Sequence, residues 1–352
     1  MTTYLNVLSC KGISRLEKTT MNTTKTQVTS KDVAKLAGVS QSTVSRVFVP
    51  GSSVAESTKQ KVYEAAKTLN YRPNAFARSL TTNESKLIGL VFPDADYPIH
   101  MKTLQLISSE LQKQGYSAVL IPWQMDALQH TIPSIFQYRV DGVIAASATM
   151  NTALYEECTE FNIPIVQYAR VVEGTKTSFV VSDNYSAGQK AAEVFYKSGV
   201  TDVAYLTGEV PTFTNGERQQ GFANEFEALS GQAVRVIEAN YDYKESIEVI
   251  RQMLSNGDKP QAVFCATDNL AMAVMDIARF EFGLSIPKDL RVIGFDDIPQ
   301  AEWVSYQLST FSQDFARLAR ESVKIIVDQI QENDPSLIKL MVPVRYVERS
   351  TC

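Results

Sequence analysis

The chain has 352 residues, of which 44% are hydrophobic, so it is long enough for two or three domains and too apolar for a disordered or fibrous protein. Its net charge of -5 hides a division: residues 1–80 carry 12 basic and 4 acidic side chains, and residues 81–352 carry 22 and 35. No run of about 18 apolar residues occurs, so we expect no membrane-spanning helix. The basic N-terminal part and the acidic remainder therefore have different electrostatic roles.

Residues 1–28 are rich in Thr, Asn and Lys without sustained periodicity, which predicts a flexible N-terminal arm. A translation start at Met21, inside this arm, is a hypothesis that mass spectrometry of the native N-terminus would test. The arm lacks the long apolar segment of a secretion signal, so export is not expected. The four cysteines are far apart and only two histidines are present, which predicts free thiols and no metal site.

A short helix is predicted from Thr29, which can form a capping box with Asp32, to Gly38, which can adopt the positive φ that ends a helix. Its predicted inward face consists of Val33, Leu36 and Ala37. Ser40 can cap a second helix, which buries Val44, Val47 and Phe48. A third helix follows the break at residues 50–51, and its predicted inward face consists of Val62, Ala65, Ala66 and Leu69.

Two short helices joined by a Gly-Val-Ser turn, with a third behind them, predict a helix-turn-helix DNA-binding headpiece over residues 29–73. An α-helix fits the major groove, where Arg46 can pair with guanine, Gln41 with adenine, and Ser42 with either. Thr43 and Ser45 suit phosphate oxygens. The alternative is a small helical protein-docking module with a solvated basic face.

Residues 74–85 form a predicted hinge and linker. The segment from Asn74 to Leu80 makes barely two helical turns, which is too short for a stable isolated helix. We therefore expect it to become helical only when a partner supports it.

Residues 86–352 alternate between short apolar strands and amphipathic helices. The predicted strands are Leu87–Phe92, Tyr116–Pro122, Gly142–Ala145, Pro164–Val166, Val203–Leu206, Val263–Cys265 and Val292–Phe295. This alternation predicts parallel, doubly wound α/β sheets covered on both faces by helices. About 265 residues are many for one such sheet, so we expect two lobes, with ligands beyond the C-terminal ends of the strands.

Several segments resemble the LacI/GalR family of bacterial transcriptional regulators. Those that resemble the family's headpiece and hinge are Val33–Ser40, Thr43–Val47, Tyr71–Asn74 and Ala77–Leu80. Those that resemble its effector-binding core are Ser182–Asn184, Arg218–Phe222, Ala266–Ala271, Gly294–Asp297 and Arg345–Ser350. The motifs occur in the family's order and cover about residues 29–350.

The resemblance implies a cytoplasmic, nucleoid-associated bacterial protein that binds a pseudo-palindromic operator as a homodimer or a dimer of dimers. Gln41, Ser42 and Arg46 would read the major groove. The hinge would become a helix in the minor groove, where Leu80 would act as the wedge between base pairs. Asn74 and Ala77 would lie at the minor groove.

For residues 86–352, the resemblance implies a two-lobed core like that of periplasmic binding proteins. Lobe 1 would comprise about residues 86–183 and 312–340, and lobe 2 about residues 184–311 and 341–350. The effector-binding residues that it implies are Ile99, His100, Arg218, Thr267 and Asp296. Asp296 would accept ligand protons, and Arg218 would point its guanidinium into the cleft. His100 is either a ligand donor or a solvated helix-terminus residue.

Besides His100, which stands where many relatives carry aromatic residues, the chain departs from the family in three places. Ala169-Arg170 stands where the family often has Asp-Arg, and losing that carboxylate suits an anionic ligand better than a neutral hexose. The expected effector is thus a sugar, a sugar acid or a phosphorylated derivative. Ala55 replaces the usual serine cap of the third helix, and Val49-Pro50 replaces residues that are commonly polar.

An enzyme and a free-standing small-molecule-binding protein are the competing functions. The candidates for catalysis, Asp268, Asp296, Asp297 and Cys265, have no nucleophile elbow or phosphate-binding glycine loop beside them. Asp296 and Asp297 are adjacent and should point apart, and Asp268 is interpreted as a helix cap. We therefore expect no enzymatic activity and no cofactor. The basic headpiece argues against a binding protein without a DNA function.

Overall fold

The computed structural model describes most of the chain. The described residues are 28–49, 51–73, 84–93, 98–123, 128–146, 152–208, 212–255, 257, 259–332 and 336–352. They belong to two compact units, residues 1–82 and 83–352. Within the described residues, no helix is long and apolar enough to cross a membrane.

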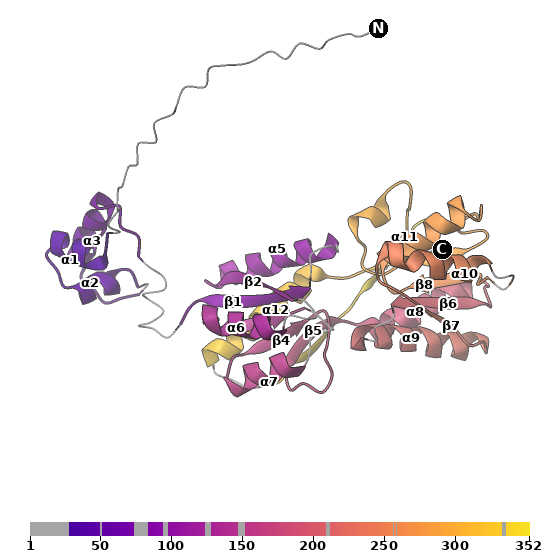
Figure 1. Cartoon of the computed structure of the whole chain (residues 1–352), viewed down its shortest axis with the longest axis horizontal. Coiled ribbons are helices and arrows are strands. Elements are labelled where there is room, and N and C mark those ends of the chain that lie inside the picture. The colour runs from indigo at the N-terminus through magenta and orange to yellow at the C-terminus, as the bar shows by residue number, and fades with distance from the viewer. Residues whose placement is uncertain are drawn as a thin grey trace, which may run out of the picture. The chain divides into compact units, whose positions relative to one another are not determined.

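The described part of the first unit is a bundle of three helices, α1 (Ser30–Ala37), α2 (Gln41–Val47) and α3 (Glu56–Thr68) (Figure 1). The capping box of Thr29 and Asp32 is confirmed, and Gly38 ends α1 with φ 64°. Ser40 caps α2 by accepting a hydrogen bond from the Thr43 amide. Ala55 stands at the N-cap of α3 without a side-chain cap, as the sequence predicted.

The core of this bundle consists of Val33, Ala34, Val44, Val47, Val62, Ala65 and Ala66. The prediction that Leu36 faces inward is wrong, because its side chain is 53% exposed. At about 100° per residue, Val33, Ala37 and Ala34 span an arc of about 100°, and Leu36 lies about 60° outside it. Ala34 therefore takes the buried position that was predicted for Leu36.

Lobe 1 of the second unit is built on a six-stranded sheet with the order β11-β5-β4-β3-β1-β2, in which every neighbouring pair is parallel. The strands are β1 (Leu87–Pro93), β2 (Ser117–Trp123), β3 (Gly142–Ala145), β4 (Ile165–Tyr168), β5 (Ser178–Ser182) and β11 (Lys339–Val342). The helices are α5 (Pro98–Lys113), α6 (Leu128–Tyr138), α7 (Thr152–Glu160) and α12 (Phe315–Glu332). Helices α5 and α12 pack on one face, and α6 and α7 cover the other.

Lobe 2 has a four-stranded parallel sheet with the order β7-β6-β8-β9. The strands are β6 (Val203–Gly208), β7 (Arg235–Ala239), β8 (Ala262–Cys265) and β9 (Arg291–Ile293). The helices are α8 (Asn184–Lys197), α9 (Phe213–Ser230), α10 (Tyr243–Ser255), α11 (Asp268–Phe280) and the 3-10 helix η1 (Pro299–Glu302). Two further strands, β10 (Thr310–Ser312) and β12 (Arg345–Val347), pair antiparallel.

The chain passes between the two lobes more than once, because β11 joins the lobe 1 sheet after all of lobe 2 has been built. The predicted architecture of parallel sheets covered on both faces is confirmed. This topology brings the C-terminal ends of strands from both lobes toward the region between them, where ligands bind in folds of this type.

Candidate functional site

Helix α2 presents a polar outer face. Gln41, Ser42, Ser45 and Arg46 are exposed, and Thr43 is half-buried. The Ser40 hydroxyl bonds to those of Ser42 and Thr43, each at 2.8 Å, and Gln41 Nε2 donates to Ser30 Oγ over 3.1 Å. Val44 and Val47 anchor the opposite face in the bundle core. The five predicted recognition residues thus lie together on one short helix.

The Arg46 side chain has no hydrogen bond or ion pair to any residue that the structure describes. Its five guanidinium donors are therefore available for a base edge or a phosphate. Asn74, Ala77 and Leu80 lie outside the described residues, so their assignment to the minor groove stays a prediction.

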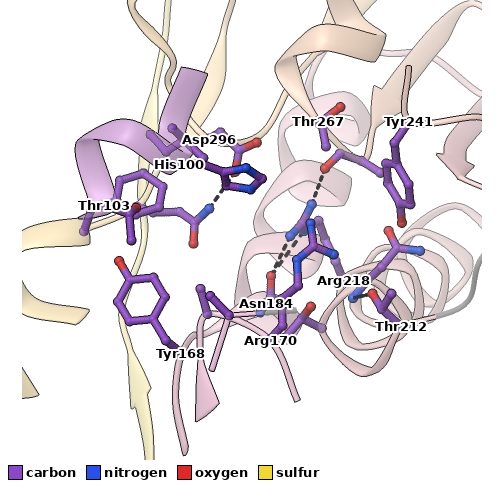
Figure 2. Close-up of a pocket in the computed structure, with 18 of the residues that line it drawn as sticks. His100, Thr103, Tyr168, Arg170, Asn184, Thr212, Arg218, Tyr241, Thr267 and Asp296 are labelled. Carbon is purple, nitrogen blue, oxygen red and sulfur yellow. Dashed lines mark hydrogen bonds between the residues drawn. The ribbon is translucent and has the colours of Figure 1, made fainter. Parts of the chain in front are cut away.

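A pocket lies between the two lobes at the C-terminal ends of the strands (Figure 2). All five predicted effector-binding residues line it, namely Ile99, His100, Arg218, Thr267 and Asp296. The cavity has a volume of about 80 Å³. At roughly 10–15 Å³ of such volume per water, about six waters would fit, which suits a ligand of monosaccharide size.

Arg218 is a buried guanidinium held from three directions. Its Nε and Nη2 donate to Asn184 Oδ1 at 3.3 and 2.7 Å, and its Nη1 donates to the backbone carbonyl of Ala266. The guanidinium carbon lies 3.2 Å from the centroid of the Phe295 ring. Because three of its five donors are engaged within the chain, Arg218 is a rigid wall of the pocket with two donors left for a ligand.

Two glycines allow α8 and α9 to bring Asn184 and Arg218 together. A Cβ on Gly188 would lie 2.2 Å from the Arg218 carbonyl oxygen, and one on Gly221 would lie 2.1 Å from the Tyr185 carbonyl oxygen. Any larger residue would push the two helices apart. The Gly221 of the Arg218–Phe222 motif therefore serves the geometry of the pocket.

Asp296 and Asp297 follow β9 and turn in different directions. Asp296 lines the pocket and accepts a hydrogen bond from Gln313 Nε2 over 2.6 Å, whereas Asp297 pairs with Arg349 at 2.7 Å. Both residues have a positive φ, 122° and 56°, which is a backbone conformation that residues other than glycine rarely adopt. Such strain persists only where the surroundings hold it, and the Arg349 contact is one such restraint.

The remaining predicted residues stand at helix starts. Thr267 caps α11, because its hydroxyl accepts from the Leu270 amide over 3.3 Å. Ile99 and His100 lie in the first turn of α5, where Ile99 is buried. The interpretation of Asp268 as the cap of α11 is wrong, since Thr267 occupies that position.

The sequence missed several lining residues. They include Thr103, Tyr168, Arg170, Thr212, Tyr241 and Gln313, of which Arg170 alone had been considered. Tyr168 ends a strand, and a search for polar residues at strand ends would have found it. Gln313 precedes α12 and reaches the pocket only because the chain returns to lobe 1 there.

Asp268 is a fully buried carboxyl group directly behind the pocket. Its Oδ2 accepts from the Ile298 amide over 2.9 Å and its Oδ1 from the Thr310 hydroxyl. Gly294 makes room for it, because a Cβ there would lie 2.2 Å from Oδ1. Burial, together with the nearby negative charge of Asp296, raises the pKa of Asp268 to about 7.

This pKa predicts a pH-dependent stability that Asp268→Asn removes. Because the folded pKa lies above the unfolded value, the contribution of Asp268 is fully present below about pH 4 and is lost as the pH rises through 7. From pH 5 to pH 8 the wild type should lose about 3 kcal/mol of unfolding free energy relative to the variant. Urea denaturation of both proteins at each pH measures this difference. A difference that stays constant with pH contradicts the prediction.

The three cysteines that the structure describes are free. Cys158 and Cys265 are buried, and burial raises the pKa of both thiols, that of Cys158 to about 12. A thiol protonated at neutral pH is a weak nucleophile, which fits the interpretation of Cys265 as a core residue.

Two family models match the chain. The model for bacterial regulatory proteins of the lacI family matches residues 29–74, and the one for a periplasmic binding protein-like domain matches residues 192–352. An HTH-type transcriptional repressor PurR from Mannheimia succiniciproducens is 31% identical over 314 residues, which cover 87% of this chain and 93% of that repressor. The chain belongs to the lacI family of bacterial regulatory proteins. It is therefore a DNA-binding transcriptional regulator with a ligand-binding core.

Other lacI-family proteins support the same conclusion. A repressor PurR from Yersinia enterocolitica is 31% identical over 329 residues, covering 91% of this chain and 96% of that protein. A solved Lac repressor dimer, bound to operator and the anti-inducer ONPF, superposes with a TM-score of 0.81 at 27% identity, covering 92% and 98% of the two chains. The predicted combination of a helix-turn-helix headpiece with a two-lobed core is thus confirmed.

Proposed function

We propose that this lacI-family chain is a repressor that binds a pseudo-palindromic operator as a homodimer or a dimer of dimers, in the bacterial cytoplasm. A sugar, sugar acid or phosphorylated sugar bound between the lobes would control its operator affinity. The observation that carries this proposal is the presence in one chain of an exposed polar face on α2 and of a polar pocket lined by both lobes.

The pocket provides the means of control. Asp296 and Arg218 belong to lobe 2, whereas His100, Tyr168 and Arg170 belong to lobe 1, so one ligand would contact both lobes. A ligand that binds one arrangement of the lobes more tightly shifts the protein toward that arrangement. If that arrangement also sets the spacing of two headpieces, effector and operator affinities become coupled reciprocally.

An exposed apolar patch on lobe 2 supports self-association. Phe280 at the end of α11 is 83% exposed, and Trp303 and Val304 after η1 are 54% and 94% exposed. Arg279 Nη1 donates to the Ser305 carbonyl, which ties the two segments together. Grouped large apolar side chains on a surface mark interaction sites, and a second copy of the chain is the partner that a two-fold operator requires.

The test of this function is operator binding. Genomic fragments are selected on the purified chain and assayed by gel shift against scrambled DNA, with and without a panel of sugars, sugar acids and sugar phosphates. The proposal expects sequence-specific binding that at least one panel member changes. Specific ligand binding without any specific DNA binding favours the alternative of a small-molecule-binding protein.

Replacing Arg46 by alanine tests the recognition face. The exposed, unpaired guanidinium is expected to pair with guanine, so Arg46→Ala should weaken operator binding by about 1–3 kcal/mol and relax sequence discrimination. The control is Lys67→Ala on α3, which removes a basic charge outside α2 and should leave discrimination between operator and scrambled DNA unchanged. Unchanged discrimination in Arg46→Ala contradicts its role.

A further inference from the structure

We propose that the pocket is selective for a small polyhydroxylated anion, such as a sugar acid or a sugar phosphate, and that Arg170 binds the anionic group. This inference rests on the proposed effector function and specifies the chemical class of the ligand. It begins with the balance of charge among the residues that line the pocket.

Two guanidinium groups face one carboxylate in this pocket. Arg170 and Arg218 line it together with Asp296, and no other acidic side chain is among the described residues that line it. Arg218 is already held by Asn184 and the Ala266 carbonyl. The described lining residues therefore carry an excess of positive charge that a neutral ligand would leave uncompensated.

Arg170 is the unmatched group. It is half-buried, and it has no hydrogen bond or ion pair with any residue in the described part of the chain. A half-buried guanidinium without a partner has lost part of its hydration and gains from an anionic partner. Its neighbour Ala169 adds no polar group and has φ 57°, so the backbone turns sharply where Arg170 enters the pocket.

Three carboxylates that adjoin pocket residues in sequence are engaged elsewhere. Asp297 pairs with Arg349, and Asp183 accepts hydrogen bonds from the Ser186 amide and hydroxyl. Asp268 is enclosed behind the pocket between Ile298 and Thr310. None of these three groups is therefore placed to neutralise Arg170.

The remaining lining groups fit hydroxyls and an anion. Asp296 can accept from a ligand hydroxyl, and the buried Tyr241 hydroxyl has no hydrogen-bond partner within the described residues. Helices α5, α9 and α11 begin at the pocket, where Ile99, Thr212 and Thr267 line it. Helix N-termini carry partial positive charge, which adds to the preference for an anion that Arg170 creates.

Calorimetry on the full chain with matched pairs of ligands tests the proposal. The pairs are D-glucose with D-gluconate, D-glucose with D-glucose 6-phosphate, D-fructose with D-fructose 6-phosphate, and D-ribose with D-ribose 5-phosphate. We expect at least one anion to bind at least ten times more tightly than its neutral partner. Arg170→Gln should weaken that anion about 10- to 100-fold and leave the neutral partner unchanged.

The control is Lys176→Gln, which removes the same charge from the same lobe at an exposed residue outside this pocket. It should leave anion binding unchanged, and Arg170→Lys should keep part of it. A panel in which no anion binds more tightly than its neutral partner overturns the proposal, as does equal anion binding by wild type and Arg170→Gln. Operator binding by the same samples without ligand tests the proposed function separately.

Discussion

Replacing Val304 by glutamate is expected to separate the dimer into monomers and to weaken operator binding by about 100-fold or more. Val304 is 94% exposed beside Trp303, in the segment that Arg279 ties to the end of α11, so in a dimer a glutamate there would place a carboxylate out of water against apolar side chains. A dimer engages two half-sites, and its second headpiece binds at high effective concentration. A monomer loses this gain in operator affinity, although its own recognition helix α2 is unchanged.

Sedimentation velocity and gel shift on the same samples measure the two effects. The matched control is Val236→Glu, an exposed position on the edge strand β7 of the same lobe, which lies outside the patch. That variant should remain dimeric and bind operator normally. If Val304→Glu remains dimeric at micromolar concentration, the patch is not the interface.

The helices of the headpiece could be predicted from local sequence patterns. The capping box at Thr29, the positive φ of Gly38 and the cap at Ser40 each depend on residues within four positions of one another. The prediction that Leu36 is buried was wrong because a helix of eight residues has too few apolar positions to define its inward face by spacing alone. Which flank was buried depended on where α2 and α3 packed.

The fold class of the core could be predicted from the sequence, but several of its strands could not. Strand β7 alternates between half-buried and exposed residues at a sheet edge, so it lacks the continuous apolar run of the central strands. Strand β11 lies beside β5, which precedes it by more than 150 residues. Periodicity carries no information on such distant pairing.

The pocket shows the same limit. Motif resemblance singled out Arg218, Thr267 and Asp296, which line the pocket, because each lies inside a recognisable segment. The contact of Arg218 with Asn184 and that of Gln313 with Asp296 arise only when separate segments meet. These partners decide how many hydrogen-bond donors and acceptors remain for a ligand, so the number of free groups in the pocket could not be counted from the sequence.

Asp296→Ala is expected to abolish the response of operator binding to the effector while leaving binding without effector intact. The carboxylate lines the pocket and accepts a hydrogen bond from Gln313, and its two oxygens have lone pairs enough to accept from ligand hydroxyls as well. Hydrogen bonds to a charged group contribute about 1.5–3 kcal/mol, so effector affinity should fall about 10- to 100-fold. No described residue of α2 takes part in this contact.

The operator complex is titrated with whichever panel ligand affects the wild type, and calorimetry measures the affinity of that ligand for each variant. Asp289→Asn is the control, because Asp289 is an exposed aspartate of the same lobe that caps the Ser285 turn. It should respond like the wild type. A normal response in Asp296→Ala would place the effector outside this pocket. Loss of operator binding without effector would instead make Asp296 a structural residue, because a residue that acts only by binding the ligand has no such contact to lose in the ligand-free protein.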